Sequence, residues 1–178
     1  MSPDSRDTIY LENKDLYIEI IENYLLNANK DVWIATANLK DMRIKYKGKF
    51  VSIVKVFSEL VFRNVSIRLL HSSNPSKAYM SSLKRSTLEK QKNFNRIQCP
   101  RVHFKTVIID HAVMYTGSAN FTGAGLGYKS EKNRNFETGL LITDPVMIRN
   151  VEALFEKIWT GSYCIGCGRR INCPKPIK

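Results

Sequence analysis

Apolar residues recur along the chain at two spacings, which predict a succession of helices and strands. Residues 9–29 and 50–62 carry apolar side chains at helical spacing, and residues 75–92 are a further predicted helix with a basic face. Short apolar runs rich in β-branched residues predict buried strands at 31–37, 65–70, 101–110, 113–116 and 136–143. The two strands that meet at Asp110 are expected to form a hairpin.

The last predicted helix has recognisable start and stop signals. Asp144 is a suitable N-cap, and Pro145 fits the first helical position. The helix is expected to run to about Trp159 and to stop at Gly161.

The order of these elements predicts an α/β fold, with a mixed central sheet flanked by helices in a single domain. The length of 178 residues is sufficient for one domain with a substantial core. Residues 1–160 would form this domain, and residues 161–178 a short cysteine-containing tail. Segments 40–49 and 117–135 are expected to be loops, the first basic and the second basic and glycine-rich.

The charge balance points to anionic partners. The chain has 28 Lys and Arg against 16 Asp and Glu, a net charge of +12, which attracts nucleic acid first and anionic membrane surfaces second. A generally lysine-rich composition without functional meaning is the alternative. The polar start at residues 1–7 and the strand-sized apolar runs predict neither a signal peptide nor a transmembrane segment, so a cytoplasmic location is expected.

One constellation of polar residues carries the chemistry. His103 and Lys105 are two positions apart, so on a strand both would face one pocket. A neutral imidazole can attack phosphorus, and the lysine beside it would stabilise the charge that builds on the phosphoryl oxygens. Ser118 and Asn120, in a G-S-x-N run, would add neutral donors to the same oxygens. A carboxylate bonded to the other imidazole nitrogen would fix its tautomer.

These residues resemble the signature of the phospholipase D superfamily. The resemblance covers residues 102–122 (VHFKTVIIDHAVMYTGSANFT) and 135–142 (NFETGLLI). It is strongest to the single-motif branch, which includes bacterial endonucleases and the Zucchini/mitochondrial cardiolipin hydrolase group. The resemblance implies an α-β-α sandwich and a phosphodiesterase that works through a covalent phosphohistidine, with no cofactor in catalysis. Asp110 closes the H-x-K-x4-D motif, and in this family its role is more structural than chemical.

The resemblance also implies a role for each remaining position. His103 would be the nucleophile, and Lys105 and Asn120 would bind the phosphate. Ser118 would lie in the same oxyanion pocket. Glu137, in the N-x-E position, would orient and polarise His103. His71 and His111 lack such neighbours in the sequence and are interpreted as ordinary structural residues.

A homodimer is expected for two reasons. Family members with a single copy of the motif pair two chains around one site. The chemistry also needs a second histidine to protonate the leaving oxygen, because an alkoxide leaves poorly.

The cysteines suggest a structural metal. Cys164 and Cys167 form a CxxC with Gly166 and a following glycine, and Cys173 lies six residues later. Cys99 would complete a tetrahedral all-thiolate zinc site without an open position for catalysis. Free thiols and an iron–sulfur cluster are the alternatives, and a redox-active CxxC fits less well.

The substrate class remains open between nucleic acid, with single strands favoured, and anionic phospholipid. Basic residues in two segments could flank the pocket and bind a nucleic-acid backbone: Lys40, Arg43, Lys45, Lys47, Lys129, Lys132 and Arg134. Tyr46, Tyr79 and Tyr128 could stack on bases or simply pack in the protein. A phospholipase or cardiolipin hydrolase is the main alternative, followed by an inert nucleic-acid-binding module and by a transferase that resolves the phosphohistidine with an alcohol.

Overall fold

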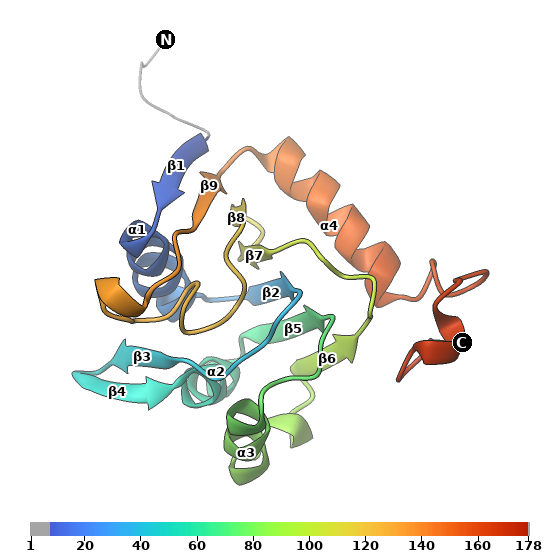
Figure 1. Cartoon of the computed structure of the whole chain (residues 1–178), viewed down its shortest axis with the longest axis horizontal. Helices are drawn as coiled ribbons and strands as arrows, with labels where there is room; N and C mark the ends of the chain where they lie inside the picture. The colour runs from blue at the N-terminus through green and yellow to red at the C-terminus, as the bar shows by residue number, and fades with distance from the viewer. Residues whose placement is uncertain (1–7, 178) are drawn as a thin grey trace.

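The computed structural model describes residues 8–177, and the expectation of no signal peptide falls on residues 1–7, outside that range. Within it, one mixed sheet has the strand order β1-β9-β8-β7-β2-β5-β6 (Figure 1). In that order the strands are Thr8–Glu12, Thr138–Ile142, Val113–Gly117, Thr106–Ile109, Asp31–Thr36, Ser66–His71 and Phe94–Gln98. β2, β5 and β6 are parallel, and the other neighbours pair antiparallel. The predicted mixed α/β fold is thus confirmed.

Helices cover both faces of the sheet (Figure 1). On one face lie α2 (Ile53–Phe62), α3 (Lys77–Arg85) and an N-terminal helix that starts as α1 (Lys14–Leu16) and continues as the π-helix η1 (Tyr17–Tyr24) and the 3₁₀ turn η2 (Leu25–Asn27). On the other face lies α4 (Pro145–Trp159). Single 3₁₀ turns are η3 (Leu88–Lys90), η4 (Glu131–Asn133) and η5 (Arg170–Asn172).

The central strand β2 is buried on both sides, which explains its continuous apolar run. Val32 and Ile34 pack into the core beneath the N-terminal helix, α2 and α3. Trp33 faces the other way, where its ring centroid lies 5.0 Å from that of Phe155 on α4.

The chain before the first helix corrects one prediction. Residues 8–12 form β1 rather than the start of a helix, and they pair with β9 at the edge of the sheet. Leu11 is buried there, whereas Ile9 and Tyr10 stay exposed. The apolar positions fit both periods, and pairing with β9 decides between them.

The predicted basic loop at 40–49 is also wrong, because most of it is a β-hairpin. β3 (Arg43–Tyr46) pairs with β4 (Lys49–Ser52). Lys47 and Gly48 both have positive φ, as a tight hairpin turn requires. The charges of the strand residues masked the alternation around the buried Ile44.

Several boundaries differ from the prediction. α2 begins only at Ile53, because the Ser52 hydroxyl caps the Val54 amide at 3.1 Å. α3 ends at Arg85, well before residue 92, and β6 was not predicted at all. The strand expected at 101–110 begins only at Thr106.

The last helix follows the prediction closely. The Asp144 carboxylate accepts hydrogen bonds from the Val146 and Met147 amides at 2.6 and 3.2 Å, and α4 starts at Pro145. Gly161 ends it with φ +79°. None of the helices in the described part of the chain is long and apolar enough to cross a membrane.

Candidate active site

The polar groups that the sequence singled out lie along one edge of the sheet. This edge is formed by the ends of the strands and not by an outer strand. β2 and β8 end at this edge, and β7 and β9 begin there, because β7 is antiparallel to β2 and β9 to β8. The residues that pair across neighbouring strands at this edge are Ala35–Thr106, Thr106–Thr116 and Gly117–Gly139. Segments far apart in the sequence therefore meet at this edge.

His103 and Lys105 lie in the extended segment just before β7, not within a strand as expected. Their side chains still alternate with apolar neighbours, since Val102 and Phe104 pack into the cluster beneath α4 while His103 is exposed. The Lys105 ammonium donates to the His103 carbonyl oxygen at 2.7 Å, and the Gly117 amide donates to the Lys105 carbonyl at 3.2 Å. These bonds join the motif to the end of β8.

Ser118 and Glu137 are hydrogen-bonded partners beside this segment. The Ser118 hydroxyl donates to Glu137 Oε2, and the Asn135 side chain donates to Oε1 at 3.0 Å. Glu137 is 8% exposed, so its carboxylate depends on these donors. Gly117 permits the close approach, because a Cβ there would collide with the backbone of Thr138 and Gly139.

Asn120 is held by a residue that sequence reasoning missed, Thr36. Asn120 Oδ1 accepts from the Thr36 hydroxyl at 3.2 Å and from the Asn38 amide at 3.0 Å. The same hydroxyl accepts from the Phe121 amide at 3.0 Å. Because these two bonds fix the Oδ1 side of the Asn120 amide, its Nδ2 group is oriented as a donor that an anion can use. The only sequence signal was that a polar residue stands at the end of an apolar strand.

The expected bond between Glu137 and His103 is not formed within residues 8–177, where Ser118 and Asn135 occupy the carboxylate. The structure therefore brings five predicted residues to one edge of the sheet but does not show the hydrogen bond between Glu137 and His103. The five are His103, Lys105, Ser118, Asn120 and Glu137.

Asp110 lies at the opposite edge, where β7 ends and β2 begins. Its carboxylate accepts the backbone amides of Asn29, Lys30 and Asp31 at 2.7 to 3.2 Å. Asp110 and His111 both have positive φ in the hairpin turn. These contacts are structural in kind, and they keep Asp110 away from the nucleophile.

The two other histidines have clear environments. His71 is buried, and its Nδ1 lies 2.9 Å from the Ser73 carbonyl; burial is the main reason that its pKa is lowered. His111 has the carboxylate neighbours that the sequence did not reveal, Glu152 at 2.5 Å and Asp31 at 3.3 Å. Burial alone would lower the pKa of His111, but the hydrogen bond and charge of Glu152, together with Asp31, raise it.

The two basic segments lie side by side. Tyr128 packs on Phe50 of the β3–β4 hairpin with ring centroids 5.0 Å apart, and both rings are partly exposed. Arg134 is half-buried and donates to the carbonyls of Asn13, Gly127 and Lys129, which makes it a structural link. Lys40, Arg43, Lys45, Lys47, Lys129 and Lys132 are exposed.

One stacking candidate is wrong. Tyr79, a residue of α3, is completely buried in the hydrophobic core, and burial raises its pKa. Tyr46 is half-buried, and Tyr128 is exposed to 46%.

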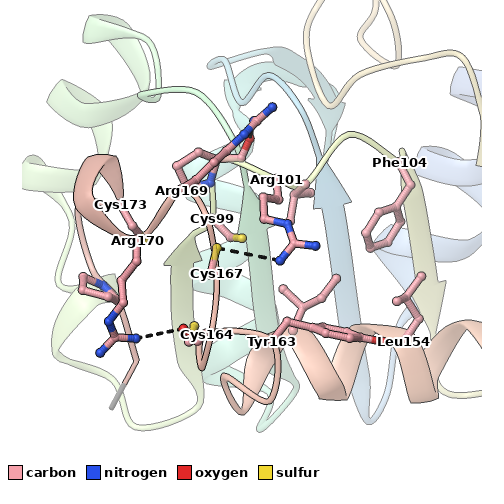
Figure 2. Close-up of a pocket in the computed structure, with 14 residues that line it drawn as sticks. Cys99, Arg101, Phe104, Leu154, Tyr163, Cys164, Cys167, Arg169, Arg170 and Cys173 are labelled. Atoms are coloured by element: carbon pink, nitrogen blue, oxygen red, sulfur yellow. Dashed lines mark hydrogen bonds between the residues drawn. The ribbon is translucent and has the colours of Figure 1, made fainter.

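All four cysteines line a single cavity of about 400 Å³ next to the end of α4 (Figure 2). Arg101, Arg169 and Arg170 line it as well. Arg101 donates to Cys167 Sγ at 3.7 Å, and the Arg169 amide and Arg101 lower the pKa of the Cys167 thiol. In the part of the chain that the structure covers, no three histidine, cysteine or acidic side chains are already grouped around one point as metal ligands.

The chain matches the model of a known protein family. The model of the family described as cardiolipin synthase, phospholipase D-like domain, matches residues 21–159, which includes every residue at the sheet edge described above. No curated protein sequence matches the chain significantly.

Solved structures show the same fold at low sequence identity. NucT from Helicobacter pylori is 15% identical with a TM-score of 0.57, and the match covers 84% of this chain and 94% of NucT. The phospholipase D family member Nuc from Salmonella typhimurium is 14% identical with a TM-score of 0.61 and coverages of 85% and 94%. Phosphatidylserine synthase from Haemophilus influenzae is 16% identical with a TM-score of 0.58, but only 38% of that chain is covered against 85% of this one.

Proposed function

Because the chain belongs to the phospholipase D-like domain family, we propose that it is a metal-independent phosphodiesterase with His103 as its nucleophile. The observation that carries the proposal is the meeting of His103, Lys105 and Asn120 with the Ser118–Glu137 pair at one edge of the sheet. A nucleophile, a fixed cation, amide and hydroxyl donors and a carboxylate are together the groups that phosphoryl transfer needs.

The reaction would proceed in two displacements. A ring nitrogen of His103 forms a bond to phosphorus while the bond from phosphorus to the leaving oxygen breaks, and a second histidine gives that oxygen its proton. Water then attacks the phosphohistidine, the phosphorus–nitrogen bond breaks, and the second histidine takes up the proton of the water. Lys105 and Asn120 Nδ2 would stabilise the phosphoryl oxygens in both steps.

The second histidine would be His103 of another copy, in a twofold dimer. The chain has a single H-x-K-x4-D, and neither His71 nor His111 can serve. His71 is buried, and His111 lies at the opposite edge of the sheet beside Asp31 and Glu152. Phe136, the neighbour of Glu137, is 97% exposed, which gives an apolar surface next to the site for such a contact.

Glu137 would take up its proposed role in the dimer. Its carboxylate is already oriented by Ser118 and Asn135. Movement of the exposed His103 ring to within hydrogen-bonding distance of it would give the imidazole a carboxylate partner that fixes its tautomer.

Nucleic acid is the substrate that the surface favours. The net charge is +12, and exposed cations concentrate on the β3–β4 hairpin and at residues 129–132. The two segments are joined by the Phe50–Tyr128 contact, which offers partly exposed rings for stacking beside the cations. Lys40 connects this surface to the site, because its amide donates to the Phe121 carbonyl, one residue after Asn120.

An anionic phospholipid is the second candidate, favoured by the description of the family model and by the likeness to phosphatidylserine synthase. Basic surfaces also attract lipid head groups. The fold is shared with that enzyme over less than half of its length, however, whereas it spans nearly all of NucT and Nuc.

Cleavage assays with labelled single-stranded and double-stranded DNA, RNA and cardiolipin vesicles would test the assignment. Cleavage of a nucleic acid, weakened by salt as expected for backbone binding, would support the nuclease proposal. Cleavage of cardiolipin alone would establish the phospholipid alternative. Binding of nucleic acid with no cleavage of any substrate would favour an inert binding module.

A further inference from the structure

The described part of the C-terminal tail, residues 161–177, has no hydrophobic core of its own. Within residues 161–177 the side chains that are not exposed belong to Cys164, Cys167, Cys173 and Ile177. Ile165 and Ile171 are 89% and 97% exposed. Apolar burial therefore contributes little to fixing this segment, and short segments of this kind are usually held by a metal or by disulfides. The residues that are withdrawn from solvent are mainly the cysteines.

The three tail cysteines face a fourth from the main domain. Cys99 directly follows β6, where its amide donates to the His71 carbonyl at 2.9 Å and its carbonyl accepts from the Val102 amide at 3.0 Å. Cys99 and the tail cysteines line the same cavity, as Figure 2 shows. The four thiols thus come from two segments, one of which is anchored to the sheet.

The backbone of the CxxC forms a tight turn. Gly166 has φ +72°, a conformation that a side chain would resist, and the Cys167 amide donates to the Cys164 carbonyl at 3.4 Å. The next turn follows at once, because the Arg170 amide donates to the Cys167 carbonyl at 3.0 Å.

We propose that Cys99, Cys164, Cys167 and Cys173 bind a structural zinc ion that fixes the tail to the segment before His103. Zinc in structural sites takes four ligands in a tetrahedron, and an all-cysteine set is a common one. The chain provides four cysteines, all of which line this cavity.

The surrounding charge fits this assignment. Zinc with four thiolates carries a net charge of −2, and Arg101, Arg169 and Arg170 line the same cavity. Arg101 already donates to Cys167 Sγ, and Arg169 crosses to the main domain to donate to the Pro100 carbonyl at 2.9 Å. The thiols line the cavity without being grouped as ligands in residues 8–177, so binding requires them to rotate into it.

The zinc ion would help to position the segment that carries His103 and would not take part in the reaction. Four thiolates leave no coordination site for water, so the metal would take no part in the hydrolysis. Cys99 is four residues before His103, and Val102 and Phe104 pack beneath α4. Fixing the tail at Cys99 would therefore stiffen the segment that carries the nucleophile.

Metal analysis of the full chain tests this independently of its enzymatic activity. The protein would be expressed with zinc and iron both supplied and purified without chelators, and its metals measured by mass spectrometry. We expect about one zinc ion per chain. A content below about a tenth of that, persisting after incubation of the reduced protein with zinc, would overturn the proposal. So would iron with visible absorption, or a mass showing disulfides in place of free thiols.

Variants locate the ion. Cys99→Ser and Cys167→Ser should each lose most of the zinc, whereas Ile171→Ser, a change in the same tail at an exposed side chain, should keep it. Where a cysteine variant fails to fold, limited trypsin digestion of the wild type replaces it. Cleavage after Arg169 and Arg170 should be slow and should accelerate many-fold when a chelator removes zinc. Zinc retained in both cysteine variants, or cleavage unaffected by chelation, would contradict the assignment.

Discussion

The ammonium group of Lys105 lies 2.7 Å from the backbone carbonyl oxygen of His103. The side chain is thereby held beside the proposed nucleophile in the absence of any substrate. A phosphoryl group at His103 would be a charged and therefore stronger acceptor than this carbonyl. Lys105 could exchange one for the other with a short movement, which would place its charge on the reacting phosphate.

Replacing Lys105 by methionine should keep the fold and remove this charge. We expect kcat to fall by about 100- to 1,000-fold, the loss typical for one group that stabilises transition-state charge. Steady-state kinetics would measure it, with Lys157→Met on α4 as the control for loss of an exposed lysine. A fall of less than about threefold would show that Lys105 is not a phosphate ligand of the reaction.

Thr36→Val tests whether the orientation of Asn120 matters. The substitution removes the hydroxyl that bonds Asn120 Oδ1, the Asn38 carbonyl and the Phe121 amide. The buried Phe121 amide, left without a partner, should lower the free energy of unfolding by about 1–3 kcal/mol.

Activity should also fall in Thr36→Val, mainly through kcat, because the Asn120 side-chain amide loses one of the two contacts that hold its Oδ1. Asn120→Ala combined with Thr36→Val should then be no slower than Asn120→Ala alone. Additive losses in this cycle would mean that Thr36 acts on catalysis by another route. Thr8→Val, at an exposed threonine of β1 paired with the far end of β9, is the matched control.

Asp110→Asn should separate stability from chemistry within the motif. The carboxylate accepts three consecutive backbone amides where β2 begins, and an uncharged amide group would hold them less well. We expect a loss of about 1–3 kcal/mol in the free energy of unfolding, measured by denaturant titration. The kcat of the folded fraction should stay within about twofold of wild type, and a much larger loss would give Asp110 a role in catalysis.

His111 should make stability depend on pH. Its pKa is raised by the hydrogen bond and charge of Glu152 and by Asp31, which outweigh burial. Because the folded state binds the proton more tightly, the stabilisation is complete below the ordinary pKa of about 6.5 and is lost as pH rises through the folded value.

The comparison is between wild type and His111→Gln. The ring is 41% exposed, so the difference at low pH should not exceed about 1 kcal/mol. Denaturant titrations near pH 6 and pH 9 should show that wild type is more stable than His111→Gln at the lower pH only. Glu152→Gln should reduce this difference in stability. A difference that is equal at both values would show that protonated His111 does not stabilise the fold.

The sequence predicted the parts of this protein that depend on local signals. Asp144 and Gly161 mark the two ends of α4 as predicted, because an N-cap and a glycine with positive φ act over only a few residues. The spacing of His103 and Lys105 placed them together, even though regular strand pairing starts only at Thr106. Their grouping with Ser118, Asn120 and Glu137 was reached through family resemblance.

What the sequence missed depends on contacts between distant segments. β1 forms because β9 is available to pair with it, and Thr36 reaches Asn120 across 84 positions. The carboxylates beside His111 come from β2 and α4, so no pattern around residue 111 could reveal them. Arg134 looked like a surface cation, but three carbonyl oxygens hold it within the loop.

The most direct test of the mechanism compares wild type with His103→Ala in excess EDTA. Both would be assayed on labelled single-stranded DNA and RNA, and acid-soluble cleavage products and labelled nucleic acid covalently bound to the protein would be quantified. We expect wild type to cleave in EDTA and to form an adduct in which the phosphoryl end of a nucleic-acid fragment is bonded to His103. His103→Ala should bind nucleic acid nearly as well but should neither cleave it nor form the adduct. Cleavage by pure His103→Ala protein, or loss of wild-type cleavage in EDTA with the fold intact, would contradict the mechanism.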